Sequence, residues 1–253
     1  MHKTIRYRVF ENPDSASAQV AAEMAEIIRV RAALGRSVVI GLATGRTTLP
    51  LYEELVYLHR EENLSFQNVI TFNLDEYHGL TAGHPASVRS FMHRNFFDHV
   101  DVPPEHIHFP DNSGSDRESL RHCANYETDI ARAGGIDYQI LGIGRSGHIG
   151  FNEPGTSIHA RTRRVRLGEI TREDATLQFG CAAEVPSHAI TMGCATILSA
   201  RRIALLAWGA HKARIVRKAI QGPVTPKVPA SYLQKHPSAR FFLDPLAASS
   251  LKH

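Results

Sequence analysis

The sequence contains few cysteines and no pattern that would pair them. Cys123, Cys181 and Cys194 are far apart, and their spacing matches neither a metal-binding motif nor a disulfide framework. Unpaired thiols are typical of a reducing compartment. The N-terminal stretch MHKTIRYRVFENPDSASAQ lacks the apolar core of a signal peptide. We therefore predict a cytoplasmic protein that needs no metal.

Long apolar runs and blocks of like charge are also missing. No stretch approaches the roughly 18 consecutive apolar residues of a transmembrane helix. The formal net charge is +4, and basic and acidic residues are mixed along the chain. This composition predicts no membrane insertion and gives no support to a nucleic-acid partner, whereas an anionic small molecule suits the mildly basic balance.

What the sequence does contain is an alternation of apolar runs and helical patterns. Four runs lack polar alternation, as strands buried on both faces do: residues 37–43, 68–74, 136–144 and 203–209. Shorter strand candidates cover residues 188–193 and 240–243. Helical patterns cover residues 16–34, 49–62, 87–99, 117–133 and 211–221. The alternation predicts one α/β domain over residues 1–253, with helices on both faces of a mostly parallel sheet.

One stretch does not fit this alternation. Residues 152–186 are rich in arginine and have few apolar runs. Segments of this length without regular structure often serve as lids or binding loops. We place a candidate lid within residues 155–186, and a surface excursion without a role is the alternative interpretation.

Polar residues follow each of the four buried runs. Ligands of open parallel sheets bind beyond the carboxyl ends of the strands. The segments that follow the runs are residues 44–48, 75–77, 142–155 and 210–212. Because the carboxyl ends of parallel strands lie at one edge of the sheet, we predict that these segments meet in one crevice.

The TGRTT segment, residues 44–48, has the composition of an anion site. It offers hydroxyl groups and Arg46 directly before a predicted helix, whose first N–H groups and positive dipole end attract phosphate. A simple helix cap is the alternative interpretation. Lys212, which opens a later helix, is either solvated or a further charge on the same phosphate.

Two acidic residues follow the second run. Adjacent residues on an extended chain face opposite ways, so at most one of Asp75 and Glu76 points into the crevice. A carboxylate there is suited to general-base catalysis, and a helix cap or a surface acid is the alternative.

The loop GIGRSGHIGFNEPG, residues 142–155, follows the third run. Gly144 and Gly147 allow a sharp turn and a close approach of the backbone to a ligand. A hydrogen bond between Glu153 and His148 would fix the imidazole tautomer and support its charged form. Such a pair moves protons at neutral pH, so we predict an active-site loop.

These segments resemble the glucosamine-6-phosphate deaminase family. The most specific elements are TFNLDEYHGL (71–80) and GHIGFNEPG (147–155). The others follow in the family's order and spacing: GLATGRTTLPLYEEL (41–55), SFMHRNFFDHV (90–100), AITMGCATILSARRI (189–203), GAHKA (209–213) and YLQKHP (232–237). Together they cover most of the chain.

The resemblance implies a Rossmann-like three-layer α/β/α sandwich and an enzyme without metal or organic cofactor. It implies conversion of glucosamine 6-phosphate and water to fructose 6-phosphate and ammonia, by ring opening and proton transfer from C2 to C1. The family's general base matches Asp75, its ring-opening histidine matches His148, and the partner of that histidine matches Glu153. The phosphate-binding residues match Thr44, Gly45, Arg46, Thr47 and Lys212.

Two positions depart from the family pattern. Many relatives have an aspartate where this chain has Ser146, which offers a hydrogen bond but no charge, so we expect Glu153 to take over the support of the imidazole. We count Ser146 among the catalytic residues. Some relatives also have an allosteric Arg-x-Lys pair and a C-terminal extension. Here Arg163 is followed by Val165 and the sequence ends at His253, so we predict no activation by an N-acetylated sugar phosphate.

Three other interpretations are open at this stage. A lactonase of the same superfamily would lack the FNEP and Asp-Glu-Tyr elements, and a non-catalytic sugar-phosphate sensor would have lost the base at Asp75. A deaminase of another hexosamine 6-phosphate, galactosamine 6-phosphate, is not distinguished by these residues. The predicted partner is a small-molecule sugar phosphate. The sequence does not decide between a monomer and a homo-oligomer, since relatives range from monomers to hexamers.

Overall fold

A seven-stranded parallel sheet forms the centre of the computed structural model, which describes residues 6–81 and 83–252. The strand order is β1-β10-β9-β6-β2-β3-β5. The strands are β1 (Arg6–Val9), β2 (Val38–Leu42), β3 (Val69–Asn73), β5 (Ile107–His108), β6 (Tyr138–Gly142), β9 (Arg202–Ala207) and β10 (Ala239–Leu243). The first five residues of the predicted non-signal N-terminus, and His253, lie outside the described residues.

The four buried runs of the sequence are the neighbouring strands β9, β6, β2 and β3, which confirms the predicted parallel sheet. β2 is buried at every position, because its two neighbours satisfy its backbone and helices cover its side chains. β1 and β5 were not predicted. They lie at the two edges of the sheet, where β1 is polar and largely exposed and β5 is only two residues long, so neither produces an apolar run.

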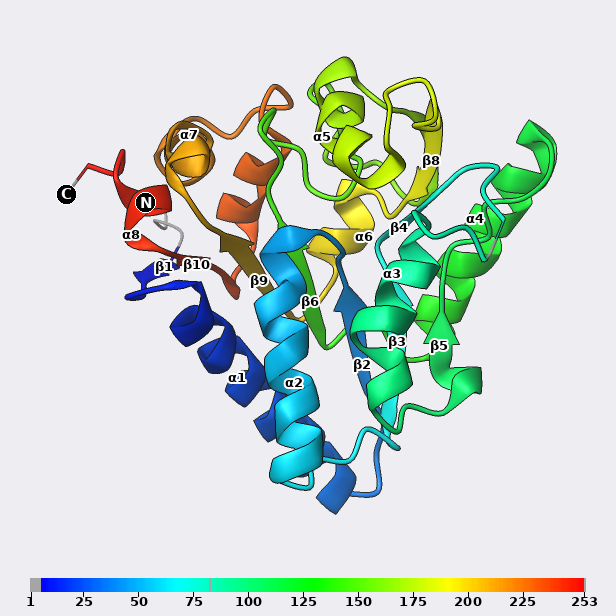
Figure 1. Ribbon diagram of the computed structural model, residues 1–253, viewed down its shortest axis with the longest axis vertical. Helices are drawn as coiled ribbons and strands as arrows, with labels where there is room; N and C mark the ends of the chain where they lie inside the picture. Colours follow the sequence, from blue (N-terminus) through cyan, green and yellow to red (C-terminus); the bar gives the residue numbers. More distant parts are fainter. Residues whose placement is uncertain (1–5, 82, 253) are drawn as a thin grey trace.

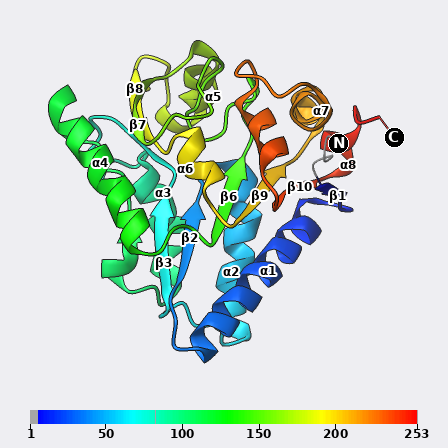
Figure 2. The ribbon, with the colours of Figure 1, turned by 180° about the vertical axis from the view of Figure 1, so that it is seen from behind.

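Helices cover both faces of the sheet, as predicted for a three-layer sandwich. Helix α2 lies in front of the strands in Figure 1 and behind them in Figure 2, and α4 lies on the opposite face. Tyr126 of α4 packs edge-on against Phe72 of β3 and donates a hydrogen bond to Asn73 O (2.7 Å). The helices are α1 (Pro13–Ala33), α2 (Leu49–Glu61), α3 (Val88–Asn95), α4 (Asp116–Arg132), α5 (Glu169–Phe179), α6 (Cys194–Leu198), α7 (Ala213–Gln221) and α8 (Pro245–Ala248).

A second, antiparallel sheet follows the carboxyl edge of the first. Its strand order is β4-β8-β7, with β4 (Asp75–Tyr77), β8 (His188–Thr191) and β7 (Arg163–Arg166). Helix α5 lies near β8 at the top of Figure 1. The expectation of an irregular segment over residues 152–186 is therefore wrong. The sequence RRVR forms a strand because it pairs with β8, while its partly exposed arginines leave no apolar pattern to detect.

The strand order places the predicted site at a switch point. From β2 the chain continues to β3 on one side, whereas β6 lies on the other side of β2 and leads to β9. The segments that follow these strands therefore start beside one another, at the position where open parallel sheets bind ligands. Within residues 6–81 and 83–252, no helix is both long enough and apolar enough to cross a membrane.

Candidate active site

His148 lies in a glycine-rich loop that leaves β6 at the switch point. Gly144 N donates to His148 O (3.0 Å) and Gly147 N donates to Gly144 O (2.9 Å), which closes the loop into a tight turn. A Cβ atom on Gly144 would lie 2.1 Å from His148 Nε2, so the imidazole packs directly on the Gly144 backbone. Gly147 has a φ of +88°, a conformation that favours glycine. The glycines therefore fix the place of the ring.

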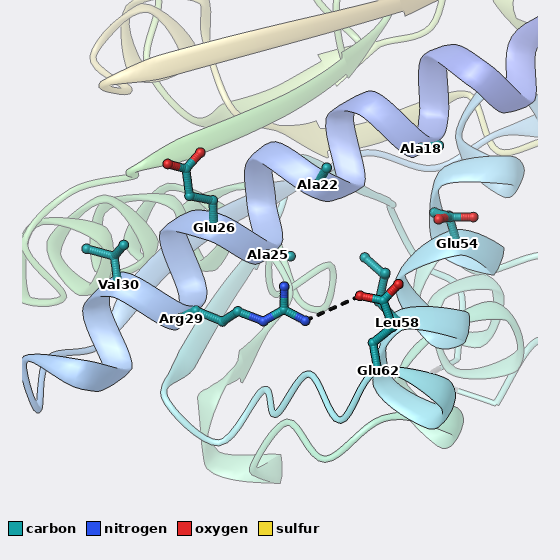
Figure 3. Close-up of a pocket in the computed structure, with 9 residues that line it drawn as sticks. All are labelled: Ala18, Ala22, Ala25, Glu26, Arg29, Val30, Glu54, Leu58 and Glu62. Carbon is teal, nitrogen blue, oxygen red and sulfur yellow. Dashed lines mark ion pairs between the residues drawn. The ribbon is translucent and has the colours of Figure 1, made fainter.

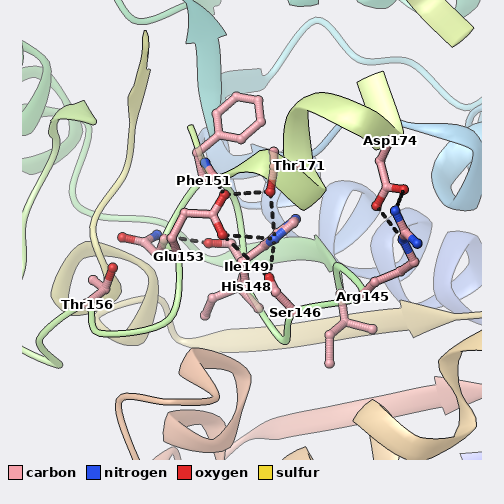
Figure 4. A network of polar contacts seen from close by, with 12 residues as sticks. Arg145, Ser146, His148, Ile149, Phe151, Glu153, Thr156, Thr171 and Asp174 are labelled. Atoms are coloured by element: carbon pink, nitrogen blue, oxygen red, sulfur yellow. Dashed lines mark hydrogen bonds and ion pairs between the residues drawn. The ribbon is translucent and has the colours of Figure 1, made fainter. Parts of the chain in front are cut away.

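Three side chains converge on His148 Nδ1 (Figure 4). Ser146 Oγ lies 2.9 Å and Thr171 Oγ1 lies 3.3 Å from this nitrogen. Glu153 Oε2 lies 3.7 Å from it, which is beyond hydrogen-bond distance. Ser146 and Glu153 belong to the same loop as the histidine, whereas Thr171 comes from the first turn of α5.

The Glu153 carboxylate is surrounded by donors. Oε1 accepts hydrogen bonds from Thr171 Oγ1 and from Gly168 N (3.2 Å), and Oε2 accepts one from Ser146 Oγ (3.5 Å). Burial alone would raise the pKa of Glu153, but the neighbouring His148 imidazole and the hydrogen bond from Thr171 outweigh it and the pKa is lowered. Glu153 is therefore ionised at neutral pH.

Asp75 borders the same loop through the small sheet. In the β4–β8 ladder Asp75 is paired with Thr191, whose hydroxyl accepts a hydrogen bond from Phe151 N (3.1 Å). Asp75 Oδ2 lies 3.6 Å from the position that a Cβ atom on Gly150 would occupy. The Asp75 side chain therefore faces the loop that carries His148.

The two adjacent acids Asp75 and Glu76 have different surroundings. Asp75 is 7% exposed. Burial raises the pKa of its carboxyl to about 7, and the charge of Glu76 adds to this effect. The Glu76 carboxylate accepts hydrogen bonds from Tyr77 N (2.8 Å), Val88 N (2.9 Å) and Arg89 N (3.0 Å), so it caps the first turn of α3. Glu76 is therefore structural, and Asp75 is the acid that is available at the loop.

The segments after β2 and β9 join the same edge. Residues 44–48 turn through Gly45, with a φ of +118°, into a 3-10 helix (Arg46–Thr48) that continues as α2. The first N–H groups of such a run have no partner within the helix. Trp208 Nε1 donates to Thr47 O (2.8 Å), which ties the segment after β9 to the segment after β2. These N–H groups are suited to an anion.

Lys212 provides a positive charge beside the His148 loop. Its Nζ donates to Ile143 O (2.8 Å), one residue before Gly144. Burial lowers the pKa of this lysine. Arg46, by contrast, is exposed to solvent. The structure thus brings Lys212 to the histidine loop, and leaves Arg46 exposed on the segment after β2.

Three residues of the site were not predicted from the sequence: Thr171, Thr191 and Trp208. Thr171 lies in the segment that the sequence predicts to be irregular, and Thr191 is the last residue of β8. Each acts through one hydroxyl or ring N–H whose partner is distant in the sequence. Local spacing in the sequence does not predict such contacts.

Two surface clefts lie elsewhere on the molecule. One, of about 420 Å³, lies between α1 and α2 and contains the Arg29–Glu62 ion pair (3.5 Å; Figure 3). The other, of about 700 Å³, lies between α7 and residues 250–252. Neither includes Asp75, His148 or Lys212, so the chemistry points to the strand edge.

The chain is similar to proteins of one family over nearly its whole length. The family described as glucosamine-6-phosphate isomerases/6-phosphogluconolactonase matches residues 11–241. A glucosamine-6-phosphate deaminase of Thermoanaerobacter pseudethanolicus is 45% identical over 231 residues, which cover 91% of this chain and 90% of the relative. A glucosamine-6-phosphate deaminase of Hahella chejuensis is 44% identical over 248 residues, which cover 98% and 92%.

Solved structures agree with this similarity. A monomeric glucosamine-6-phosphate deaminase superposes with a TM-score of 0.93 at 41% identity, covering 98% of this chain and all of the other. A 6-phosphogluconolactonase from Trypanosoma brucei has a TM-score of 0.79 at 20% identity, with both chains fully covered. The second likeness concerns the fold alone.

Proposed function

The chain belongs to the family of glucosamine-6-phosphate isomerases and 6-phosphogluconolactonases, and we propose that it is a deaminase that converts glucosamine 6-phosphate and water to fructose 6-phosphate and ammonia. The observation that carries this proposal is the buried Asp75, with a pKa of about 7, beside the loop that holds His148 and Glu153. The relatives at 44–45% identity bear the deaminase name, whereas the lactonase cited above shares the fold at 20% identity.

The phosphate group of the substrate binds at the segment after β2. The N–H groups and hydroxyls of Thr44, Gly45 and Thr47 surround the anion at the start of the α2 run. Lys212, held beside the His148 loop by its bond to Ile143 O, adds a point charge, and Arg46 adds a second charge from the solvent side. With the phosphate bound there, the proposal directs the sugar ring toward His148 and Asp75.

His148 opens the sugar ring. Its imidazole takes the proton of the C1 hydroxyl and returns a proton to the ring oxygen while the bond between C1 and that oxygen breaks, which leaves an aldehyde at C1. The nearby Glu153 carboxylate supports the positive charge that the imidazole carries during the step. Ser146 lies between the two groups.

Asp75 moves the second proton. As a carboxylate it removes the proton from C2 of the open chain while the C1 oxygen takes a proton from solvent, which gives an enolamine. It then returns its proton to C1, which gives an iminium ion at C2. Water then adds to C2 and ammonia leaves, so that a ketone forms. A base with a pKa of about 7 is well matched to this work at neutral pH. The steps use only protons and water, and we assign the reaction to the cytoplasm, where three unpaired cysteines stay reduced.

We also propose that N-acetylglucosamine 6-phosphate does not activate the enzyme. The Arg163 guanidinium donates to Asn152 Oδ1 (2.9 Å) and to Thr156 Oγ1 (3.4 Å), so it holds the end of the FNEP loop in place. Substrate saturation curves should be hyperbolic with and without this compound. A sigmoidal curve that the compound makes hyperbolic would contradict the proposal.

An ammonia-release assay tests the function. We expect ammonia from glucosamine 6-phosphate, with fructose 6-phosphate as the second product, and no hydrolysis of 6-phosphogluconolactone. Preferential release of ammonia from galactosamine 6-phosphate would show that this epimer is the preferred substrate. Tight binding of glucosamine 6-phosphate without ammonia would identify a sensor, and lactone hydrolysis alone would identify a lactonase.

A further inference from the structure

We propose that Ser146 and Thr171 form a hydroxyl relay that links Glu153 to His148 and keeps a hydrogen on His148 Nδ1, so that Thr171 is a positioning residue for ring opening. This inference rests on the proposed function and deepens it.

The distances show why a relay is needed. Glu153 Oε2 is 3.7 Å from His148 Nδ1, too far for a direct hydrogen bond. The Ser146 hydroxyl is 2.9 Å from the nitrogen and 3.5 Å from Oε2, and the Thr171 hydroxyl is 3.3 Å from the nitrogen and hydrogen-bonded to Oε1. Both hydroxyls therefore lie between the carboxylate and the ring.

The number of available hydrogens indicates which group donates each hydrogen bond of the relay. A hydroxyl has one hydrogen to donate, and an ionised carboxylate can only accept. Thr171 donates its hydrogen to Glu153 in a short bond, and we infer that Ser146 directs its hydrogen to the same carboxylate, so that each hydroxyl accepts from His148. With this arrangement the hydrogen between them and the ring belongs to Nδ1. The neutral imidazole keeps a free lone pair on Nε2, which is the nitrogen left to take a proton from the sugar.

The structure around Thr171 holds its hydroxyl in place. Thr171 is 5% exposed and lies in the first turn of α5, two residues after Glu169 begins the helix. A Cβ atom on Gly168 would lie 3.2 Å from the Glu153 carboxyl carbon, so the helix start fits closely around this acid. Arg172, the next residue, donates to Ala182 O (3.0 Å) and Val185 O (3.3 Å), which fixes the helix against the segment that follows it.

The test compares two threonines of the same helix. Thr171→Val keeps the shape and removes the hydroxyl, and Thr176→Val removes a hydroxyl that donates only to Arg172 O (3.2 Å), away from the imidazole. We expect Thr171→Val to lower kcat/KM for glucosamine 6-phosphate by roughly tenfold to hundredfold. Thr171→Ser should recover most of the loss, and Thr176→Val should remain within about twofold of the wild type.

Substrate deuterated at C2 separates positioning from general damage. When ring opening limits the reaction, the C2 proton transfer is hidden, so the isotope effect on kcat/KM should fall toward one in Thr171→Val and should not fall in Thr176→Val. An unchanged isotope effect together with unchanged kcat/KM in Thr171→Val would overturn the proposal. Where Thr171→Val fails to fold, Ser146→Ala serves as the second variant for the same measurement.

Nitrogen-15 NMR of His148 measures which imidazole nitrogen carries the hydrogen, and it needs no turnover. The wild type should carry the hydrogen on Nδ1, and the Ser146→Ala/Thr171→Val double variant should populate both tautomers. A hydrogen on Nε2 in the wild type, or an unchanged tautomer in the double variant, would refute the relay. Absence of ammonia release in the wild type would instead refute the proposed function, so the two failures are distinct.

Discussion

Asp75 and Glu153 are two carboxylates of one site, and their surroundings are opposite. Asp75 is buried beside another acid, and the pKa of its carboxyl rises to about 7. Glu153 accepts hydrogen bonds from Thr171, Ser146 and Gly168 N, and its pKa falls. Environments that separate two pKa values assign the two roles. These surroundings support our proposal that Asp75 gains and loses the proton and that Glu153 serves as a fixed charge.

The difference has a structural origin. Asp75 lies on a short strand whose backbone pairs with β8, so no backbone N–H is directed at its carboxylate in that ladder. Glu153 lies where a loop meets the start of α5, and helix starts offer N–H groups and hydroxyls to anions. The same carboxyl group thus has a raised pKa on the strand and a lowered pKa at the helix start.

The largest loss of activity is expected when the proposed base is removed. Asp75→Asn should lower kcat by about 10²–10⁴-fold, because the amide cannot accept the C2 proton. Binding of fructose 6-phosphate should remain within a few-fold, since the phosphate segment is untouched. Ammonia release and calorimetric binding measure the two effects. Near-normal turnover would remove Asp75 from the role of base.

The same variant should change the pH dependence of stability. The carboxyl of Asp75 titrates near 3.8 without burial and near 7 in the folded protein, so folding favours its protonated form. The wild type should therefore lose stability as the pH rises from about 4 to 7, by up to ~4 kcal/mol from this group. Asp75→Asn should lack that loss. Chemical unfolding at several pH values measures it, and parallel curves for the two proteins would contradict the raised pKa.

Removal of the fixed charge should cost less than removal of the base. Glu153→Gln keeps the size of the side chain and loses the counter-charge near His148, so we expect a fall in kcat/KM of roughly tenfold to hundredfold. The C2 isotope effect should shrink, because ring opening becomes limiting. A loss as large as that of Asp75→Asn, with a full isotope effect, would show that the roles are not separate.

The support of the imidazole can be tested at Gly144. A Cβ atom there would lie 2.1 Å from His148 Nε2, so Gly144→Ala must displace the ring and should lower kcat/KM by about tenfold. Gly142→Ala is the matched control, because no atom lies within 4 Å of a Cβ at that position. Equal activity of the two variants would mean that the placement of the ring on Gly144 is unimportant.

The smallest effect is expected at Ser146. Ser146→Asp keeps an acceptor near His148 Nδ1 and adds charge beside Glu153, so activity at neutral pH should stay within about threefold of the wild type or rise. Steady-state assays across pH measure this. A complete loss would show that the hydroxyl hydrogen, which the aspartate lacks, is indispensable.

The sequence predicted the elements that depend on local patterns. The four central strands followed from apolar runs, most helix positions followed from helical patterns, and the common edge of the segments after the strands followed from the strand ends. Adjacent placement of Asp75 and Glu76 predicted that they face opposite ways, and Glu76 caps α3 while Asp75 faces the histidine loop. The roles of the site residues themselves stay proposals.

What the sequence did not predict depends on distant pairing. Strand β7 is arginine-rich and forms because it pairs with β8, so the β-strand propensity of its residues does not predict it. Thr171 reaches Glu153 across 18 positions, and Thr191 reaches Phe151 across 40. Single hydroxyl contacts of this kind need the tertiary structure, because any threonine in the segment has the same local signature.

The most direct test of the contrast between the two carboxylates is a carbon-13 NMR titration of the labelled side-chain carboxyls, with Asp75→Asn and Glu153→Gln used for assignment. We expect the Asp75 carboxyl to titrate near 7 and the Glu153 carboxyl to titrate below 4.5, its ordinary value. An Asp75 carboxyl that titrates at or below 4 would contradict the account.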